Sequence, residues 1–202
     1  MEYLRDAALQ RDWEQHRFLV DSIELPGRPV TDAIAEIDDD LHQRTNNPWW
    51  TETVWFAWMV PERNLVGYFY PIFRPNLGVQ AGGVLVFDDR AELPWELPIF
   101  EYDWHQQIPQ GIDLRDARLN NGMTIKCVEM GKTYDLGYKS RDLNLSLRVD
   151  AVARPLVTAA TVPFIHGHID QLCHVTGSMD IRGDVIAVDC PGHAGPVMGT
   201  SR

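Results

Sequence analysis

The chain has 202 residues, 45% of them hydrophobic and 23% charged, a composition typical of a packed globular protein rather than a disordered one. Its formal net charge of −11 argues against nucleic acid and anionic membrane surfaces as partners, because both select a basic face. No apolar run approaches the roughly 20 residues of a membrane span, and the charged N-terminus lacks the apolar core of a signal peptide. We therefore expect a cytoplasmic protein without a membrane span.

Residues 1–47 are expected to form a helical and irregular N-terminal segment. Leu4, Ala8 and Trp13 have a loosely helical spacing. Thr31 or Asp32 can cap a second short helix.

Residues 48–202 are expected to form one β-domain. Strand-forming segments follow one another, separated by short connectors that contain Pro, Asn or Gly. The predicted strands cover residues 51–60, 65–73, 79–87, 112–119, 123–130, 132–139, 143–153, 172–181 and 185–190. Asn120-Asn121-Gly122 is a strong hairpin signal, and apolar and polar residues alternate along 143–153. The sequence predicts an all-β fold, an antiparallel lipocalin-like (calycin-type) barrel or a strongly curved sandwich with a short helical N-terminal segment.

Cofactor and disulfide motifs are missing from the sequence. It contains no phosphate-binding loop and no dinucleotide fingerprint, so we expect no cofactor. Cys127, Cys173 and Cys190 lie in apolar-rich stretches without CxxC spacing, and we expect them to be small buried side chains.

Two segments carry a family resemblance. WWTETVWFAWMVPERNLVGYFYPIFRPNLGVQAGGVLVFDD resembles the opening strands of the AttH-like proteins, which are related to the carotenoid 1,2-hydratases (hydroxyneurosporene synthases). GHIDQLCHVTGSMDIRGDVIAVD resembles the family's G-H-x-x-Q and V-T-G stretches and the hairpin that follows them. The resemblance spans about residues 48–202 and implies lipocalin-like β-domains that hold an apolar ligand in or between them.

The chain departs from this family in two places. Members usually continue into a second barrel, which is missing here, so the chain resembles only the N-terminal half. Such a half would expose an apolar interface, and we expect a homodimer or a partner β-domain to cover it. The family's G-x-R-D-R-S-W-G stretch is replaced by GHAGPVMG at residues 192–199, so none of that motif's Arg, Asp and Trp residues is assigned here.

The stretch HGHIDQLCHVTG, residues 166–177, carries the first candidate site. In an extended strand the side chains of His166, His168, Asp170 and His174 point to one face. His174 lies roughly 20 Å beyond His168 at about 3.3 Å per residue, too far to share an ion unless the strand bends. A metal site would need His166, His168 and a ligand from another strand, and we predict none. His168 and Asp170 could instead move a proton at neutral pH. The resemblance places His168 and Gln171 at recurrent polar positions of the family, and a hydrogen-bonded structural histidine is the alternative.

Glu52 is the second candidate for acid–base chemistry. It directly precedes the apolar run 54–60, where a carboxylate could lie at a barrel mouth and act as an acid. The alternative is an exposed residue at the start of a strand.

Aromatic residues supply the candidate ligand wall. Most of the tryptophans lie between residues 49 and 104, a density that suits a thick core or a lined cavity. Tyr68 and Tyr70 share a strand face with Val66 and Ile72, which suits either a core or an apolar ligand wall with two hydroxyls. Turn chemistry is the alternative for the Arg and Asn of the FRPN stretch. The predicted ligand-binding residues are Trp58, Tyr68, Tyr70, Arg74, Asn76 and Gln171.

Three functions remain open. The first is binding of a hydrophobic small molecule, such as a lipid, an isoprenoid or a steroid. The second is a cofactor-independent hydratase, isomerase or cyclase, in which Glu52 or Asp170 would be the acid and His168 its partner. The third is a structural half-protein that needs a partner barrel.

Overall fold

The computed structural model describes residues 40–42, 46–162 and 165–200. The predicted N-terminal helices lie outside the described residues. Within the described chain all regular structure is β-strand, apart from three 3-10 turns at Pro61–Arg63, Pro75–Leu77 and Pro94–Glu96. The prediction of an all-β fold is confirmed. No helix in this part of the chain is long and apolar enough to cross a membrane.

Eleven strands follow one another along the chain. They are β1 Thr51–Val60, β2 Leu65–Arg74, β3 Val79–Phe87, β4 Ile99–Gln107, β5 Asp116–Arg118, β6 Thr124–Glu129, β7 Thr133–Lys139, β8 Leu143–Ala151, β9 Leu156–Val162, β10 Ile165–Ile181 and β11 Asp184–Thr200. A strand overlaps each predicted range, but β5 has only three residues where residues 112–119 were expected, and β10 and β11 are much longer than expected. The predicted hairpin at Asn120-Asn121-Gly122 joins β5 and β6, and Gly122 takes the positive φ of 88° that this turn requires.

Two strands were not predicted, β4 and β9. In β4 the aromatic residues Phe100, Tyr102 and Trp104 lie on the outer face, and the inner positions after Ile99 are Glu101 and Asp103. The alternation is therefore the reverse of that in a central strand, where the apolar residues face the core. The sequence of β9, LVTAATV, has neither alternation nor a turn signal of its own. Both strands form because the edge of a neighbouring strand provides backbone hydrogen bonds: β4 pairs with β3, and β9 pairs with β10.

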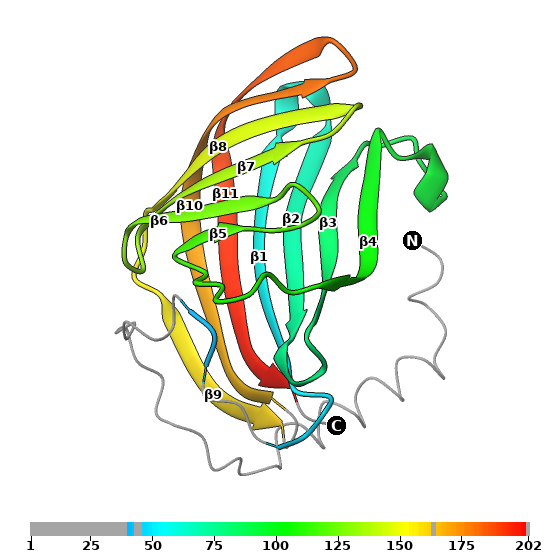
Figure 1. The fold of residues 1–202 in the computed structure, drawn as a ribbon. Coiled ribbons are helices and arrows are strands. Elements are labelled where there is room, and N and C mark those ends of the chain that lie inside the picture. The colour runs from blue at the N-terminus through cyan, green and yellow to red at the C-terminus, as the bar shows by residue number, and fades with distance from the viewer. Residues whose placement is uncertain (1–39, 43–45, 163–164, 201–202) are drawn as a thin grey trace, which may run out of the picture.

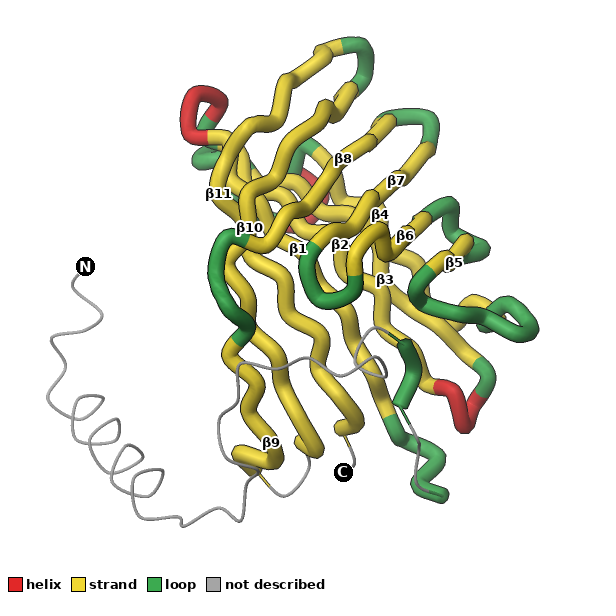
Figure 2. The backbone as a smooth tube through the Cα atoms, turned by 90° about the vertical axis from the view of Figure 1, so that its left-hand side faces the viewer, coloured by secondary structure: helices red, strands yellow, loops and turns green. Residues whose placement is uncertain are grey.

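All the strands belong to one antiparallel sheet that curls into a half-barrel (Figure 1). Its order is β4-β3-β2-β1-β11-β10-β8-β7-β6-β5, and β9 pairs with β10. In Figure 2, β9 lies at the end of β10 opposite the β10–β11 turn. The N-terminal and C-terminal halves of the domain meet where β1 pairs with β11, so β11 is the strand that completes the sheet.

Side-chain hydrogen bonds connect the two ends of the curled sheet. The Tyr138 hydroxyl on β7 donates to Glu101 on β4 at 2.5 Å, and Ser140 donates to the other oxygen of the same carboxylate at 2.7 Å. Asn121 donates to the carbonyl of Gly82 on β3 at 3.2 Å. Burial and the hydrogen bond to Glu101 raise the pKa of Tyr138 above its usual value, so its phenol remains a donor.

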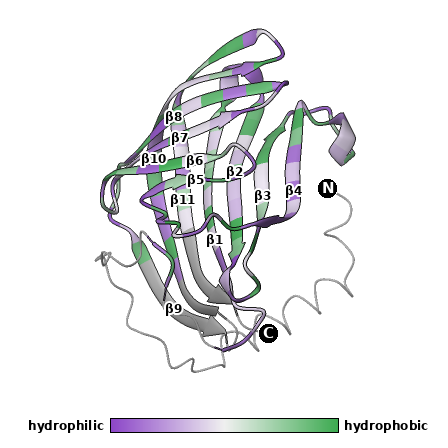
Figure 3. Ribbon diagram, viewed as in Figure 1, coloured by the Kyte–Doolittle hydropathy of each residue, from purple (hydrophilic) through white to green (hydrophobic). Residues whose placement is uncertain are grey.

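The inner face of the sheet holds the hydrophobic core. Leucines 143, 145 and 147 of β8 are buried and the residues between them are exposed, which confirms the predicted alternation. Apolar and polar residues alternate in this way along many strands (Figure 3). The largest fully buried side chains include Trp58, Phe69, Phe73, Ile99, Met123 and Met179.

Cys173 and Cys190 lie buried on this inner face, as predicted, and Cys127 is half-buried. Burial raises the pKa of Cys173 to about 11, because the thiolate would lose its hydration. The same cause raises the pKa of Cys190. Both groups are therefore protonated, weakly reactive thiols near neutral pH.

Two tryptophans of β1 lie across glycines of the neighbouring strands. Trp58 covers Gly67 on the inner face, where a Cβ atom on the glycine would come within 2.2 Å of the indole. Trp55 covers Gly195 of β11 on the outer face, where the corresponding distance is also 2.2 Å. Only glycine leaves room for a flat indole ring directly above the strand backbone.

Candidate functional site

Strand β10 carries the candidate residues His168, Asp170 and Gln171, and their side chains lie on opposite faces of the sheet. Successive side chains of a strand alternate between faces, so Asp170 points outward and Gln171 inward. Gln171 is 4% exposed, whereas the side chain of Asp170 is 36% exposed. The predicted residues therefore divide into an outer group and an inner group that the sheet separates.

Three outer side chains form a histidine–carboxylate–histidine cluster. Nδ1 of His168 lies 2.8 Å from one oxygen of Asp170. Nε2 of His193, on β11, lies 3.1 Å from the other oxygen. The predicted pairing of His168 with Asp170 is present, and His193 joins it. We call His168, Asp170 and His193 the outer triad.

The outer triad has the geometry of a proton-handling group. A carboxylate between two imidazoles can fix the tautomer of each ring and can hold a proton shared with either ring. Nδ1 of His193 is buried and has no hydrogen-bond partner among the described residues. This favours the tautomer with the proton on Nε2, because a proton on Nδ1 would be an unpaired buried donor. The side chains of His168 and His193 are 28% and 27% exposed, so the triad remains open to small molecules.

An aromatic row continues from the triad across the outer face. The ring centroid of Trp55 lies 4.8 Å from that of His193 and 5.9 Å from that of Tyr68. Tyr68 in turn contacts Phe87 edge-on at 5.6 Å. The row crosses β11, β1, β2 and β3, and its rings can present a π surface to an apolar molecule or a cation.

The sequence prediction missed His193 and Trp55. The β10–β11 turn lies at Arg182-Gly183, and antiparallel pairing outward from this turn brings Leu172 opposite His193. His193 is then a diagonal neighbour of Asp170 on the same face. The signal was present in the sequence, but the strand was expected to end at residue 190, before His193.

His174 pairs with a different carboxylate from that of the outer triad. Nε2 of His174 lies 2.6 Å from Asp189, at some distance along β10 from the outer triad. Among the described residues, no three His, Cys, Asp or Glu side chains are grouped so that they could hold an ion.

An open cleft lies on the inner side of β10. Its volume is about 470 Å³. Its lining residues come from the β6–β7 turn, from the end of β8 with the segment that follows it, and from Gln171; they are Met130, Gly131, Lys132, Ala151, Val152, Ala153, Arg154, Pro155 and Gln171. The amide of Gln171 donates to the carbonyls of Gly131 (3.1 Å) and Ala153 (3.2 Å) and thereby ties together the two chain segments that form the cleft walls.

Glu52 points inward and is buried, with 3% exposure. Its carboxylate accepts hydrogen bonds from the backbone N–H of His42 at 3.0 Å and from the indole N–H of Trp50 at 2.9 Å. Nδ1 of His42 lies 3.0 Å from the same group. The carboxylate therefore binds the segment that leads into β1. The alternative of an exposed residue at the start of a strand is wrong, because this side chain is buried.

The other predicted ligand-binding residues are also divided between the faces. Trp58 lies in the core with 1% exposure. Tyr68 and Tyr70 share a face with Val66 and Ile72, as predicted, but this is the half-buried outer face, because residues 65, 69 and 73 occupy the core. The Arg74 guanidinium lies 5.7 Å from the ring centre of Trp49, and Asn76 donates to the carbonyl of Asn47.

The strand order, the curl of the sheet and its packed inner face define an all-β protein with a lipocalin-like half-barrel. The chain belongs to the family described as domain of unknown function DUF7064, whose model matches residues 35–194. No curated protein matches this chain by sequence.

A solved structure has the same type of fold. It is the crystal structure of a protein from Nitrosomonas europaea that is described as a candidate AttH, with a TM-score of 0.53 and 15% sequence identity. The match covers 87% of this chain and 58% of that chain. At this identity the likeness concerns the fold alone, and it confirms the AttH-like fold that the sequence suggested. This chain spans little more than half of its structural neighbour.

Proposed function

We propose that the chain binds a hydrophobic small molecule, such as a lipid, an isoprenoid or a steroid-like compound, in the cleft beside Gln171. The observation that carries this proposal is the size of the cleft. Its volume of about 470 Å³ falls within the range of roughly 300–1,000 Å³ that is usual for small-molecule sites. The AttH-like fold supports ligand binding in general terms.

The chemistry of the cleft walls indicates a ligand with an apolar body and a polar or anionic end. Met130 and Val152 line the cleft and are 52% and 65% exposed, so both present apolar surface that a ligand could cover. Arg154 and Lys132 add polar, basic groups to the same walls, and the Lys132 ammonium is paired with the Glu129 carboxylate. An isoprenoid or fatty carboxylate would satisfy both features.

Filling the cleft is expected to abolish this binding. Val152→Trp adds a large ring to an exposed position in the cleft wall, so the fold should tolerate it while the ligand loses its space. We expect the affinity for retinoic acid, followed by quenching of protein fluorescence, to fall at least about tenfold, a loss of roughly 1.4 kcal/mol. Val185→Trp is the matched control, because Val185 is 68% exposed and lies at the start of β11, outside the cleft.

The test compares ligand binding by the cleft variant with ligand binding by the control variant. Unchanged binding by Val185→Trp together with lost binding by Val152→Trp supports the cleft. Equal binding by the two variants, or no binding by the unaltered protein of retinoic acid, retinol or a long-chain fatty acid, contradicts the proposal.

A second candidate function is cofactor-independent acid–base chemistry at the outer triad. The specific observation in its favour is the Asp170 carboxylate, which lies between two imidazoles and beside the aromatic row. The sequence resemblance to carotenoid 1,2-hydratases suggests addition of water to a C=C bond. In such a reaction the outer triad, in its protonated form, would give a proton to one alkene carbon, water would attack the resulting carbocation, and the triad would take back one proton from the added water, so that it ends as it began. Nearby aromatic faces stabilise the cation.

Hydration can be detected directly by mass spectrometry. We expect the protein to convert an isoprenoid with a terminal trisubstituted C=C bond, such as geraniol, into a product that contains one additional water. Asp170→Asn should reduce the rate about 100-fold or more, because general acid–base catalysis typically contributes a factor of this size. Retinoic acid binding at the cleft should be unchanged in this variant. A rate equal to that of the unaltered protein would exclude the outer triad as the acid–base group.

A further inference from the structure

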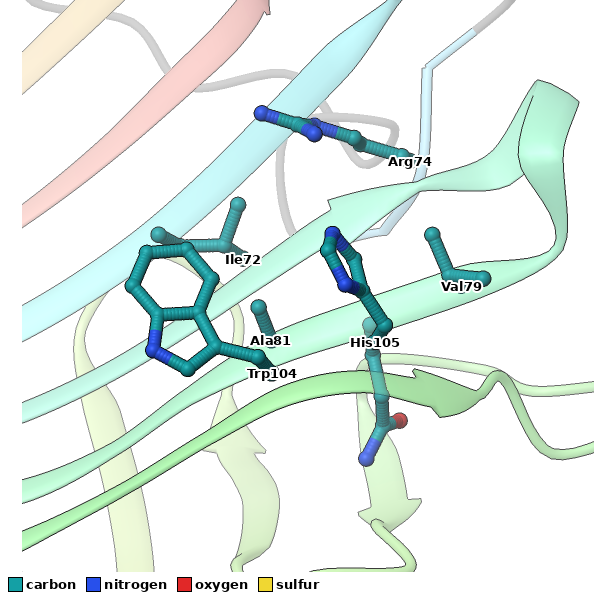
Figure 4. Close-up of a pocket in the computed structure, with 7 residues that line it drawn as sticks. Ile72, Arg74, Val79, Ala81, Trp104 and His105 are labelled. Carbon is teal, nitrogen blue, oxygen red and sulfur yellow. The ribbon is translucent and has the colours of Figure 1, made fainter.

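A second, smaller hollow lies on the outer face near the edge of the sheet, on the side opposite the cleft. Its volume is about 30 Å³. Figure 4 shows Ile72, Val79 and Ala81 along its base, with Trp104, His105 and Arg74 around it. The base is apolar because β2 and β3 present small or aliphatic side chains at this level.

A β-bulge places Trp104 and His105 side by side. Gln80 pairs with Gln106 and Gly82 pairs with Asp103, so two residues of β4 face the single residue Ala81 of β3. Adjacent residues of a regular strand would point to opposite faces. In this bulge both rings lie on the outer face, and their centroids are 6.2 Å apart.

The bulge carries backbone strain. His105 has a φ of +56°, in the left-handed region that L-residues seldom adopt. Strain of this kind persists where the surrounding structure requires it, and bulges often occur where a strand redirects side chains toward a binding site. The redirected ring of Trp104 is 67% exposed, so the bulge places a large aromatic surface in solvent.

Arg74 gives the hollow a positive charge. The guanidinium lies over the ring of Trp49, and no carboxylate within the described ranges forms an ion pair with it. The chain contains 29 acidic and only 18 basic residues, so an arginine that no carboxylate of the described segments pairs with stands out from the overall charge balance. The positive charge of Arg74 also acts on Tyr102. Burial raises the pKa of the Tyr102 phenol, Tyr70 adds a smaller increase, and Arg74 opposes the increase.

We infer that the hollow binds the carboxylate of a small aromatic acid. The carboxylate sits between Arg74 and His105, and the aromatic ring stacks on Trp104. A hollow of about 30 Å³ admits a group the size of one or two water molecules, which suits a carboxylate but not a ring. Arginine matches a planar carboxylate through paired N–H donors, and an exposed indole offers a stacking surface. This site is independent of the cleft beside Gln171, because the sheet separates the two.

The probe for this site is 2-naphthoate, and its uncharged analogue 2-naphthamide is the comparison. The indole N–H resonance of Trp104, identified by its loss in Trp104→Phe, would be followed by ¹H–¹⁵N NMR. We expect 2-naphthoate to shift this resonance with a Kd of about 1 mM, as befits a ligand of so few atoms. Binding of 2-naphthamide should be at least about tenfold weaker, because it lacks the charge that Arg74 recognises.

Variants separate the contributions of the two parts of the site. Arg74→Gln should remove the preference for the acid over the amide, and Trp104→Ala should abolish binding of both. Trp95→Ala is the matched control, because Trp95 is 77% exposed and lies outside the hollow, and it should leave binding unchanged. His105→Asn tests the bulge, because asparagine tolerates a positive φ and should retain the stacking.

The proposal is overturned if the Trp104 resonance does not shift at roughly ten times the expected Kd. It is also overturned if Arg74→Gln retains the preference for the acid. Val152→Trp should leave the 2-naphthoate titration unchanged, so failure of the cleft and failure of this site can be distinguished.

Discussion

Replacing Gly67 with alanine is expected to lower the free energy of unfolding by about 3 kcal/mol or more. The new Cβ atom would lie 2.2 Å from the ring of Trp58, which is buried in the core and cannot move into solvent. Overpacking of a closed core typically costs about 1–3 kcal/mol, and displacing an indole from a central strand pair belongs at the upper end. Urea denaturation followed by circular dichroism measures this loss.

A double-mutant cycle shows whether the contact with Trp58 is the cause. Trp58→Leu is itself destabilising, but in that background Gly67→Ala should cost less than about 1 kcal/mol, since the overlap no longer exists. If the cost is the same in both backgrounds, the steric explanation is wrong and the loss belongs to the backbone of β2.

Removing the Glu52 carboxylate is expected to have a comparable effect on stability. Glu52→Ala would leave the indole N–H of Trp50 and the backbone N–H of His42 without their acceptor in a buried site. Each buried donor without a partner costs about 1–3 kcal/mol, so we expect a total loss of about 3–4 kcal/mol, measured by urea denaturation. The position of Glu52 thus favours an anchoring role for the segment before β1.

Glu52→Gln distinguishes anchoring from acid catalysis. The amide retains one oxygen that can accept a hydrogen bond, so the loss of stability should be smaller, about 1–2 kcal/mol. Hydration of geraniol, if present, should continue in this variant. Normal stability together with loss of turnover would show that the carboxylate acts chemically, as the sequence interpretation allowed.

Much of the fold could be predicted because strand patterns are local. Alternation in β8 and the Asn-Gly turn between β5 and β6 are encoded within a few residues. Edge strand β4 could not be recognised in the same way, because Glu101 is bound by Tyr138 and Ser140 from the far end of the sheet. A residue that looks unsuitable for a strand is accommodated there by partners almost 40 positions away.

The candidate site likewise combines features that local sequence predicts with features that depend on the tertiary structure. The period of two along a strand was enough to place His168 and Asp170 together, and also Tyr68 and Tyr70, because neighbours two apart always share a face. It could not say which face is the core. That depends on how the sheet curls, and the curl put the tyrosines and the histidines outside and Glu52 and Trp58 inside.

By itself, the sequence determined the all-β class, most of the strands and the pairing of His168 with Asp170, because each of these follows from spacing along one chain segment. Only the tertiary structure added His193 to that pair, brought Arg74 beside the bulge at Trp104 and His105, and closed the cleft around Gln171. These arrangements join different strands. The physical reason is register: one residue of slip between two strands would move every such side chain to the opposite face.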